Sequence, residues 1–181
     1  MRFTAQRLAG VYLIELERRE DERGFFARSF CEDEFAAHGL HSRFPQGNVS
    51  HNRRLHTLRG MHYQAAPTHE VKVVRCTAGA IYDVVVDLRP RSATRFDWLG
   101  VELSAATRSQ LYVPAQFGHG FLTLAEDTEV SYLMGESYVA NAARGFRWDD
   151  PRIGVRWPAM PEVISERDRT YPDLGPEVTD A

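Results

Sequence analysis

Hydrophobic residues occur along the chain in short runs, many of them alternating with polar residues, and Gly, Pro, Asn or Asp closes most runs. Alternation at every second position is typical of a strand with one buried face. Turn signals roughly 8–12 residues apart are typical of an all-β sandwich or barrel. We predict strands over Gly10–Leu16, Phe25–Phe30, Gly47–Ser50, Leu58–Gln64, Val71–Thr77, Ala80–Leu88, Asp97–Leu103, Gln110–Val113, Gly120–Leu124, Thr128–Met134 and Arg144–Trp148.

The best candidate for a helix is Glu32–His38, followed by Gly39 at the C-terminal cap. So short a helix lies on a sheet and does not form a core of its own. From Trp157 onward proline recurs, at positions 158, 161, 172 and 176, and proline interrupts regular structure. We therefore expect an all-β sandwich with one or two short helices. An extended C-terminal arm from about residue 158 would pack on it without regular elements, its last few residues frayed.

Composition narrows the class of protein. A chain of 181 residues suits a single domain over residues 1–181, and its 43% hydrophobic and 26% charged residues are usual for a globular protein. A net charge of −3 gives no general attraction to nucleic acid or to anionic membranes. Cys31 and Cys76 belong to no zinc or disulfide motif, which suits a reducing compartment. With neither a signal peptide nor a long apolar run, a cytoplasmic protein is expected.

His62 stands in an apolar strand pattern, Leu58–Gln64, whereas most of the other histidines fall among polar residues. A glycine such as Gly60 beside a polar side chain often lets a ligand approach the backbone. Strict alternation places Arg59 on the opposite face of this strand from His62. Arg59 can therefore reach the same site only from a strand end or a β-bulge.

Metal binding is not supported by the pattern. Two-motif barrels of the cupin type use a His-x-His pair, a Glu and a later His. This chain keeps His62 but has Gln64 at the second position, and it keeps His119 in Pro114–Gly120. Lys72 follows, and an ammonium is a poor neighbour for a divalent cation. A catalytic metal site needs about three protein ligands, so we predict no metal and no cofactor.

The remaining groups suit proton transfer next to a ketone. His62 can act as a base because the imidazole pKa lies near neutrality. Lys72 or His119 can stabilise the negative charge that develops on the enolate oxygen. Inversion of a carbon centre also requires an acid on the face opposite the base, and the hydroxyl of Tyr132 suits that role.

Two further kinds of group complete the candidate site. Asp168, within Ser165–Asp168, is positioned to orient an imidazole and raise its basicity. Arg23, Arg59 and Arg167 offer forked donors that suit a diphosphate. Each of these residues also has a structural alternative: a solvated arginine, a tyrosine at the edge of the core, or an aspartate that caps a turn.

Six motifs in order resemble the dTDP-4-dehydrorhamnose 3,5-epimerase family, from about residue 7 to about residue 173. They are Asp21–Phe26, Leu58–Gln64, Lys72–Cys76, Asp83–Arg89, Phe117–Phe121 and Trp148–Pro151. The resemblance implies a cupin-like jelly-roll β-sandwich that forms a homodimer and uses no metal. It also implies an isomerase of deoxysugar biosynthesis that epimerises C3 and C5 of a nucleotide-linked 4-keto-6-deoxyhexose.

The resemblance also implies roles for individual residues. His62 matches the general base, Asp168 its carboxylate partner, Lys72 the cation near the C4 oxygen and Tyr132 the general acid. Tyr138 matches an aromatic residue that stacks on the nucleobase. The other implied contacts to the sugar and the diphosphate are Arg23, Arg28, Gln46, Asn48, Arg59, His119 and Arg167.

Departures from the family pattern gather at the nucleotide end. The family often has an aromatic residue at Arg19 and Glu at Arg28 and at Ala143. At Arg167, apart from these three, the family often has Lys, so the charge is kept. A guanidinium in place of a carboxylate inverts both charge and hydrogen-bonding role. A 3-only or 5-only epimerase that acts on a CDP- or GDP-linked keto sugar is therefore the alternative.

Two other classes of protein share features of this sequence, and the fold also predicts an assembly. A metal-dependent cupin isomerase or oxygenase would contain stoichiometric metal after purification. A non-catalytic sugar-nucleotide binding module would have lost His62, Tyr132 or Asp168, and none is lost. Because a sandwich has exposed strand edges and Gly10–Leu16 has few partners nearby in sequence, we predict a homodimer with residues 1–30 in its interface.

Overall fold

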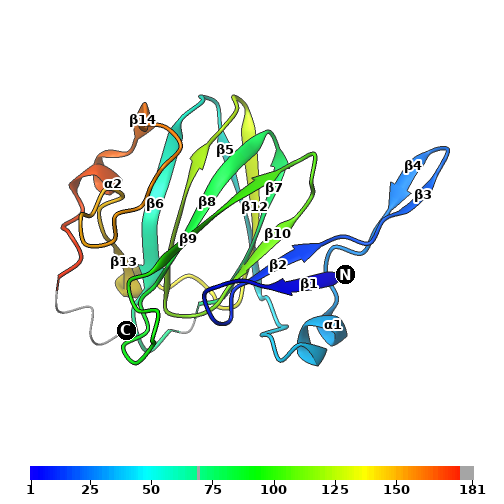
Figure 1. Cartoon of the computed structure of the whole chain (residues 1–181), viewed down its shortest axis with the longest axis horizontal. Helices are drawn as coiled ribbons and strands as arrows, with labels where there is room; N and C mark the ends of the chain where they lie inside the picture. The colour runs from blue at the N-terminus through cyan, green and yellow to red at the C-terminus, as the bar shows by residue number, and fades with distance from the viewer. Residues whose placement is uncertain (69, 176–181) are drawn as a thin grey trace.

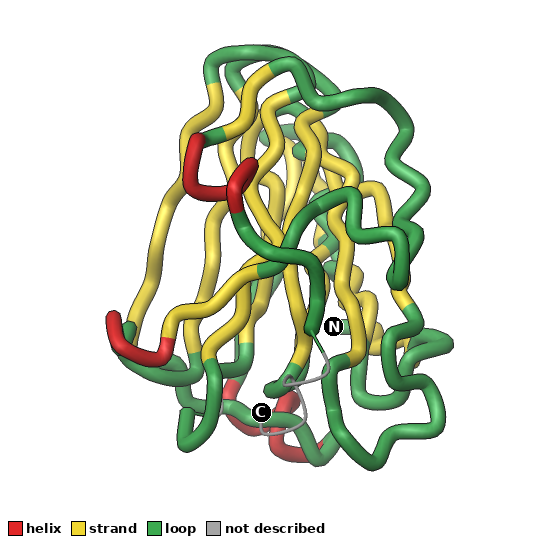
Figure 2. The backbone as a smooth tube through the Cα atoms, turned by 90° about the vertical axis from the view of Figure 1, so that its left-hand side faces the viewer, coloured by secondary structure: helices red, strands yellow, loops and turns green. Residues whose placement is uncertain are grey.

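The protein, described here by a computed structural model over residues 1–68 and 70–175, is built from two antiparallel sheets (Figures 1 and 2). Strand order in the first sheet is β1 (Arg2–Ala5), β2 (Tyr12–Glu15), β10 (Gln110–Val113), β7 (Lys72–Ala78), β12 (Thr128–Met134), β5 (Gln46–Asn52). Strand order in the second is β13 (Ala143–Gly145), β6 (Thr57–Gln64), β11 (Phe117–Thr123), β8 (Ala80–Asp87), β9 (Trp98–Ser104). The predicted all-β, cupin-like sandwich is confirmed.

A short hairpin and short helices lie outside the two main sheets. A separate hairpin consists of β3 (Arg19–Asp21) and β4 (Gly24–Phe26), and Figure 1 shows it standing away from the sheets. The helices are α1 (Glu32–Ala37), the single 3₁₀ turn η1 (Ala140–Ala142) and α2 (Glu166–Thr170). No helix in the described ranges is long and apolar enough to cross a membrane.

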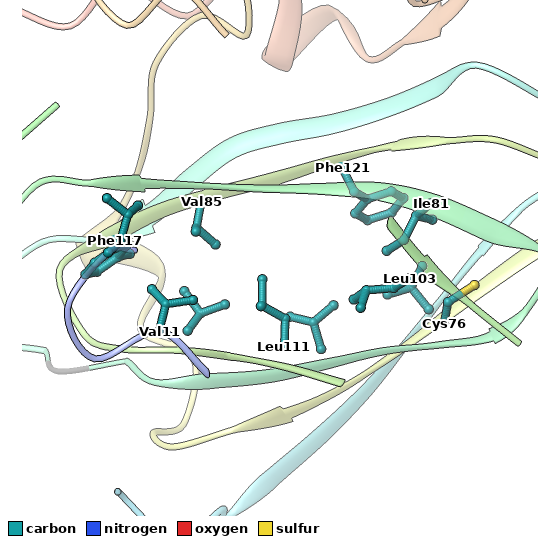
Figure 3. Packing of buried hydrophobic residues seen from close by; sticks show 12 residues of the cluster. Val11, Cys76, Ile81, Val85, Leu103, Leu111, Phe117 and Phe121 are labelled. Carbon is teal, nitrogen blue, oxygen red and sulfur yellow. The ribbon is translucent and has the colours of Figure 1, made fainter. Parts of the chain in front are cut away.

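The main core lies between the two sheets, where the inward side chains of alternating strands meet (Figure 3). The first sheet contributes Cys76 and Leu111, and the second contributes Val85 and Phe121, all of them at most 1% exposed. Burial of one such side chain stabilises the fold by roughly 1.5–3 kcal/mol. This packing holds the strands of the facing sheets at a fixed separation, which any site between them requires.

A β-bulge in β6 changes which side chains share a face. His62 pairs with His119 and Arg59 pairs with Phe121, so three steps along β6 oppose two along β11. The extra residue brings Arg59 and His62 to the same side, where strict alternation had separated them. Gly60 occupies the bulge with φ +140°, and a Cβ there would lie 2.6 Å from the Cα of Gly120. The close approach of β6 to β11 at the bulge therefore requires glycine at position 60.

The long predicted strands are present, but several of their bounds differ from the prediction. The strand predicted over Gly10–Leu16 covers only Tyr12–Glu15, and the strand predicted over Gly120–Leu124 already begins at Phe117. The strand predicted over Phe25–Phe30 ends at Phe26, because the hairpin offers β4 three paired positions and no further partner. The strand predicted over Arg144–Trp148 is confined to Ala143–Gly145, where β6 supplies its partners. The short strands β1 and β3 were not predicted, since runs of three or four residues carry little pattern.

The prediction of a C-terminal arm without regular elements is wrong. Between Pro161 and Pro172 the chain forms β14 (Val163–Ile164), which pairs in parallel with β6, and then helix α2. The hydroxyl of Ser165 caps α2 by accepting a hydrogen bond from the backbone N–H of Asp168 at 3.1 Å. Prolines thus bracket the helix and do not interrupt it. The predicted fraying concerns residues 176–181, which lie outside the described residues.

Candidate active site

A pocket of about 300 Å³ opens between the two sheets and beside α2. Strands β5, β7 and β12 form one wall, and β6 and β11 form the other. Its lining residues are Asn48, Val49, Ser50, Arg59, His62, Lys72, His119, Phe121, Tyr132, Met134 and Asp168. All four residues expected to be catalytic therefore meet in one cavity, together with Asn48, Arg59 and His119.

His62 and Asp168 form a hydrogen-bonded pair at the floor of this pocket. The Nε2 atom of His62 lies 2.7 Å from Oδ1 of Asp168, and the two side chains are 41% and 6% exposed. Burial opposes ionisation of Asp168, but hydrogen bonds from His62 and from the Gly60 N–H outweigh it and lower the pKa of this carboxyl. An ionised Asp168 accepts from Nε2–H, so the lone pair of His62 is on Nδ1.

Tyr132 faces His62 from the other sheet. It lies on β12 between Val74 of β7 and Asn48 of β5, and its ring meets that of His119 edge-on at 6.2 Å between centroids. Burial, followed by the charge of Asp83, raises the pKa of Tyr132 far above its ordinary value. The phenol therefore stays protonated at neutral pH.

Lys72 is buried and paired with a carboxylate. Its Nζ atom lies 2.9 Å from Oε2 of Glu70. The other carboxylate oxygen of Glu70 accepts a hydrogen bond from Nε2 of Gln64 at 2.6 Å. Sequence reasoning missed Glu70, because a charged residue in front of a strand usually belongs to a solvated loop.

His119 has its own buried carboxylate partner. Its Nε2 atom lies 2.8 Å from Oδ1 of Asp83 on the neighbouring strand β8, and their side chains are 6% and 0% exposed. The sequence predicted no individual role for Asp83, which is only the first residue of the motif Asp83–Arg89. Its position within the otherwise apolar run Asp83–Val86 is the signal that could have identified it as a buried partner of a polar group.

A smaller pocket of about 150 Å³ adjoins the first and shares His62, Lys72 and Met134 with it. It adds Tyr138 and Arg167, two of the residues expected at the nucleotide end. The remaining lining residues are Tyr63, Gln64, Glu70, Ala143 and Arg144. The two pockets together form a continuous site, with the acid–base groups at one end and an exposed aromatic residue and arginines at the other.

Gln46 supports this site from its edge. Its side-chain oxygen accepts a hydrogen bond from the Tyr138 N–H at 3.0 Å, and its Nε2 donates to Asn48 at 3.1 Å. Gln46 thus holds the segment that carries Tyr138.

Arg23 and Arg28 lie away from the pocket of their own chain. Arg23 is on the projecting hairpin, where it pairs with Asp21 at 2.6 Å. Arg28 pairs with Glu34 and lines a different cavity of about 350 Å³ near Met1. In Figure 1 the hairpin and α2 stand at opposite sides of the molecule.

The donor set does not resemble a metal centre. In residues 1–68 and 70–175, no three His, Cys, Asp or Glu side chains are grouped to hold a metal ion. Each of the two pocket histidines instead pairs with one carboxylate. A sandwich with an imidazole base on one sheet, and a phenol and an ammonium on the facing sheet, defines an isomerase that transfers protons beside a carbonyl.

Comparison with known proteins specifies the family. The family profile described as dTDP-4-dehydrorhamnose 3,5-epimerase matches residues 5–175. A dTDP-4-dehydrorhamnose 3,5-epimerase of Sinorhizobium fredii is 42% identical over 96% of this chain and 90% of its own length. The chain belongs to the dTDP-4-dehydrorhamnose 3,5-epimerase family.

Solved structures agree with this assignment. The enzyme of that name from Bacillus anthracis, solved with TDP and PPi bound, has a TM-score of 0.92 and 37% identity, covering 96% of this chain and 99% of its own. The dTDP-6-deoxy-D-glucose-3,5-epimerase of Legionella pneumophila, in complex with dTDP-4-keto-L-rhamnose, has a TM-score of 0.90 and 31% identity, covering 98% and 96%.

Proposed function

We propose that this protein inverts C3 and C5 of a dTDP-linked 4-keto-6-deoxyhexose in deoxysugar biosynthesis, with His62 as base and Tyr132 as acid. The observation that carries the proposal is the position of these two groups on facing sheets. A sugar ring between the sheets has the imidazole on one face and the phenol on the other. Inversion requires this arrangement, since the proton must leave one face and return to the opposite one.

The mechanism follows from the contacts of each group. Nδ1 of His62 removes the proton from a carbon next to the C4 ketone, and the electrons move onto the C4 oxygen. Lys72 donates a hydrogen bond to this developing enolate. Asp168 stays ionised and stabilises the imidazolium, as its lowered pKa favours. Tyr132 then delivers a proton to the carbon from the opposite face. Once His62 has released its proton to solvent and Tyr132 has regained one from solvent, a second round inverts the other centre.

The neighbouring groups serve binding. Arg59 and Arg167 offer forked donors to the diphosphate, and the exposed ring of Tyr138 offers a stacking surface to the base. Asn48 offers its amide to the sugar. Ala143 provides no carboxylate at this end, so recognition of the base depends on other groups.

The direct test is incubation of the purified protein in deuterated water with the 4-keto-6-deoxyglucose derivatives of dTDP, CDP and GDP. We expect NMR to show deuterium at C3 and C5 and inversion at both carbons, fastest with the dTDP sugar. Absence of exchange with all three substrates would refute the proposed function. Exchange at one carbon, or preference for CDP or GDP, would establish the single-centre or alternative-carrier enzyme instead.

We further propose that the active form is a homodimer in which the hairpin β3–β4 of one chain completes the pocket of its partner. The hairpin projects from the sandwich and exposes Phe25 and Phe26, at 38% and 75%. It also carries Arg23, a residue expected to contact substrate, away from its own pocket. The receiving surface is β5, an outer strand of its sheet that lines the pocket and exposes Val49 at 65%.

Light scattering at micromolar concentration is expected to give the mass of a dimer. Co-expression of an Arg23→Ala chain with a His62→Asn chain is expected to restore activity that neither variant has alone. In a mixed dimer one of the two sites has both intact residues. If the chains pair at random, about half of the dimers are mixed, so about a quarter of the wild-type activity should return in the co-expressed preparation. A monomeric mass, or no recovery in an isolated mixed dimer, would show that Arg23 does not act across the interface.

A further inference from the structure

The buried carboxylate of Glu70 lies where the two pockets meet and has no role in the mechanism above. Its side chain is 7% exposed, and that of its partner Lys72 is 10% exposed. Its two oxygens accept from different donors: Oε2 from Lys72 at 2.9 Å and Oε1 from Gln64 at 2.6 Å. Charge-assisted hydrogen bonds of this kind are short and directional, so Glu70 holds the ammonium in one place.

Gln64 is itself fixed by the backbone. Its side-chain oxygen accepts a hydrogen bond from the Val139 N–H at 3.2 Å, so its Nε2 must face Glu70. If the amide of Gln64 turned over, its NH₂ group would meet another donor at Val139. Position 70 must therefore present an acceptor on both sides. A carboxylate meets this requirement, and an amide in the same place does not.

We infer that Glu70 is a positioning residue that directs the Lys72 ammonium toward the carbonyl oxygen of the sugar. The inference rests on the proposed function, because it takes Lys72 as the cation at that oxygen. A lysine side chain has a flexible stem of four carbons, and its ammonium has three N–H donors. When one donor is held by Glu70, the stem is fixed and the remaining donors point into the cavity that Lys72 lines.

The test replaces the carboxylate by an amide of nearly the same shape. In Glu70→Gln the new NH₂ group faces a donor, either Lys72 or Gln64, and the ammonium loses its fixed position. We expect kcat to fall by about 10- to 100-fold, the range for a misplaced catalytic group, while KM stays within about threefold. The split arises because the ammonium meets full negative charge only in the transition state.

A second variant separates geometry from loss of fold. The exchanged pair Gln64→Glu with Glu70→Gln restores complementarity: the new glutamate accepts from Val139 and from the new amide, whose oxygen accepts from Lys72. We expect this pair to recover kcat to within about threefold of wild type. Gln64→Glu alone places two carboxylates face to face and is expected to remain slow.

Thermal unfolding identifies the variants that are folded. A folded Glu70→Gln variant with wild-type kcat would overturn the inference, as would a folded exchanged pair that stays slow. If Glu70→Gln does not fold, the kcat of the folded exchanged pair decides whether Glu70 positions Lys72. A wild-type protein that exchanges no deuterium into any keto sugar would refute the proposed function itself, whereas normal wild-type turnover with either result above would refute the role of Glu70 alone.

Discussion

His62→Asn is expected to lower turnover by about 10²–10⁴, the range for loss of a general base. Asparagine cannot accept a proton near neutral pH, so the enolate cannot form at its normal rate. The imidazole is 41% exposed and lines an open pocket, so its removal leaves the packing between the sheets intact. Turnover would be measured by deuterium exchange and stability by thermal unfolding.

His56→Asn is the matched control for this variant. His56 lies shortly before the same strand and also contacts a carboxylate, with Nδ1 at 3.0 Å from Glu162. It does not line either of the two joined pockets. Its substitution should leave turnover unchanged. A His62→Asn protein that unfolds, or that keeps near-normal turnover, would contradict the assignment of the base.

Tyr132→Phe is expected to separate exchange from inversion. The variant keeps the ring and removes the proton donor, while His62 and Lys72 still form the enolate. Deuterium should enter C3 or C5 at close to the normal rate, because His62 returns it to the original face. Net inversion should fall at least about tenfold, and up to the 10²–10⁴ typical of a lost general acid.

Tyr112→Phe controls for the loss of a buried hydroxyl from the same sheet. The Tyr112 oxygen accepts from the His41 N–H at 3.0 Å, remote from the pocket, so this change should affect stability and not inversion. Normal inversion by Tyr132→Phe would mean that another group is the acid. Loss of exchange as well would mean that Tyr132 helps to form the enolate.

The sandwich could be predicted because strand alternation is a local signal, whereas the roles of the four expected catalytic residues came mainly from six ordered motifs that resemble a known family. Strand alternation depends on consecutive residues, and His62 and Tyr132 each stand out within one strand. The bulge that places Arg59 beside His62 depends on the pairing of β6 with β11, which no single strand reveals. Helix α2 was missed because its flanking prolines resemble a break in structure.

Contacts between distant segments explain the other omissions. The role of Glu70 depends on its contacts with Gln64 of β6 and Lys72 of β7, and these contacts form only when the chain is folded. The position of Arg23 relative to the pocket depends on where the hairpin points, and this direction is set by tertiary structure.

The hydrogen bond between His62 and Asp168 joins residues 106 positions apart, and α2 follows every strand of the two main sheets in the chain. A ribosome therefore produces all of those strands before it produces Asp168, and this long loop must close before the imidazole is oriented. Proteolytic cleavage in the segment that precedes β14 would leave the strands from β1 to β13, with Lys72 and Tyr132, in place without the aspartate. Such a fragment would also lack Arg167 of α2 and would not turn over sugar nucleotides, whereas its hairpin β3–β4 would still be available to complete the pocket of an intact partner.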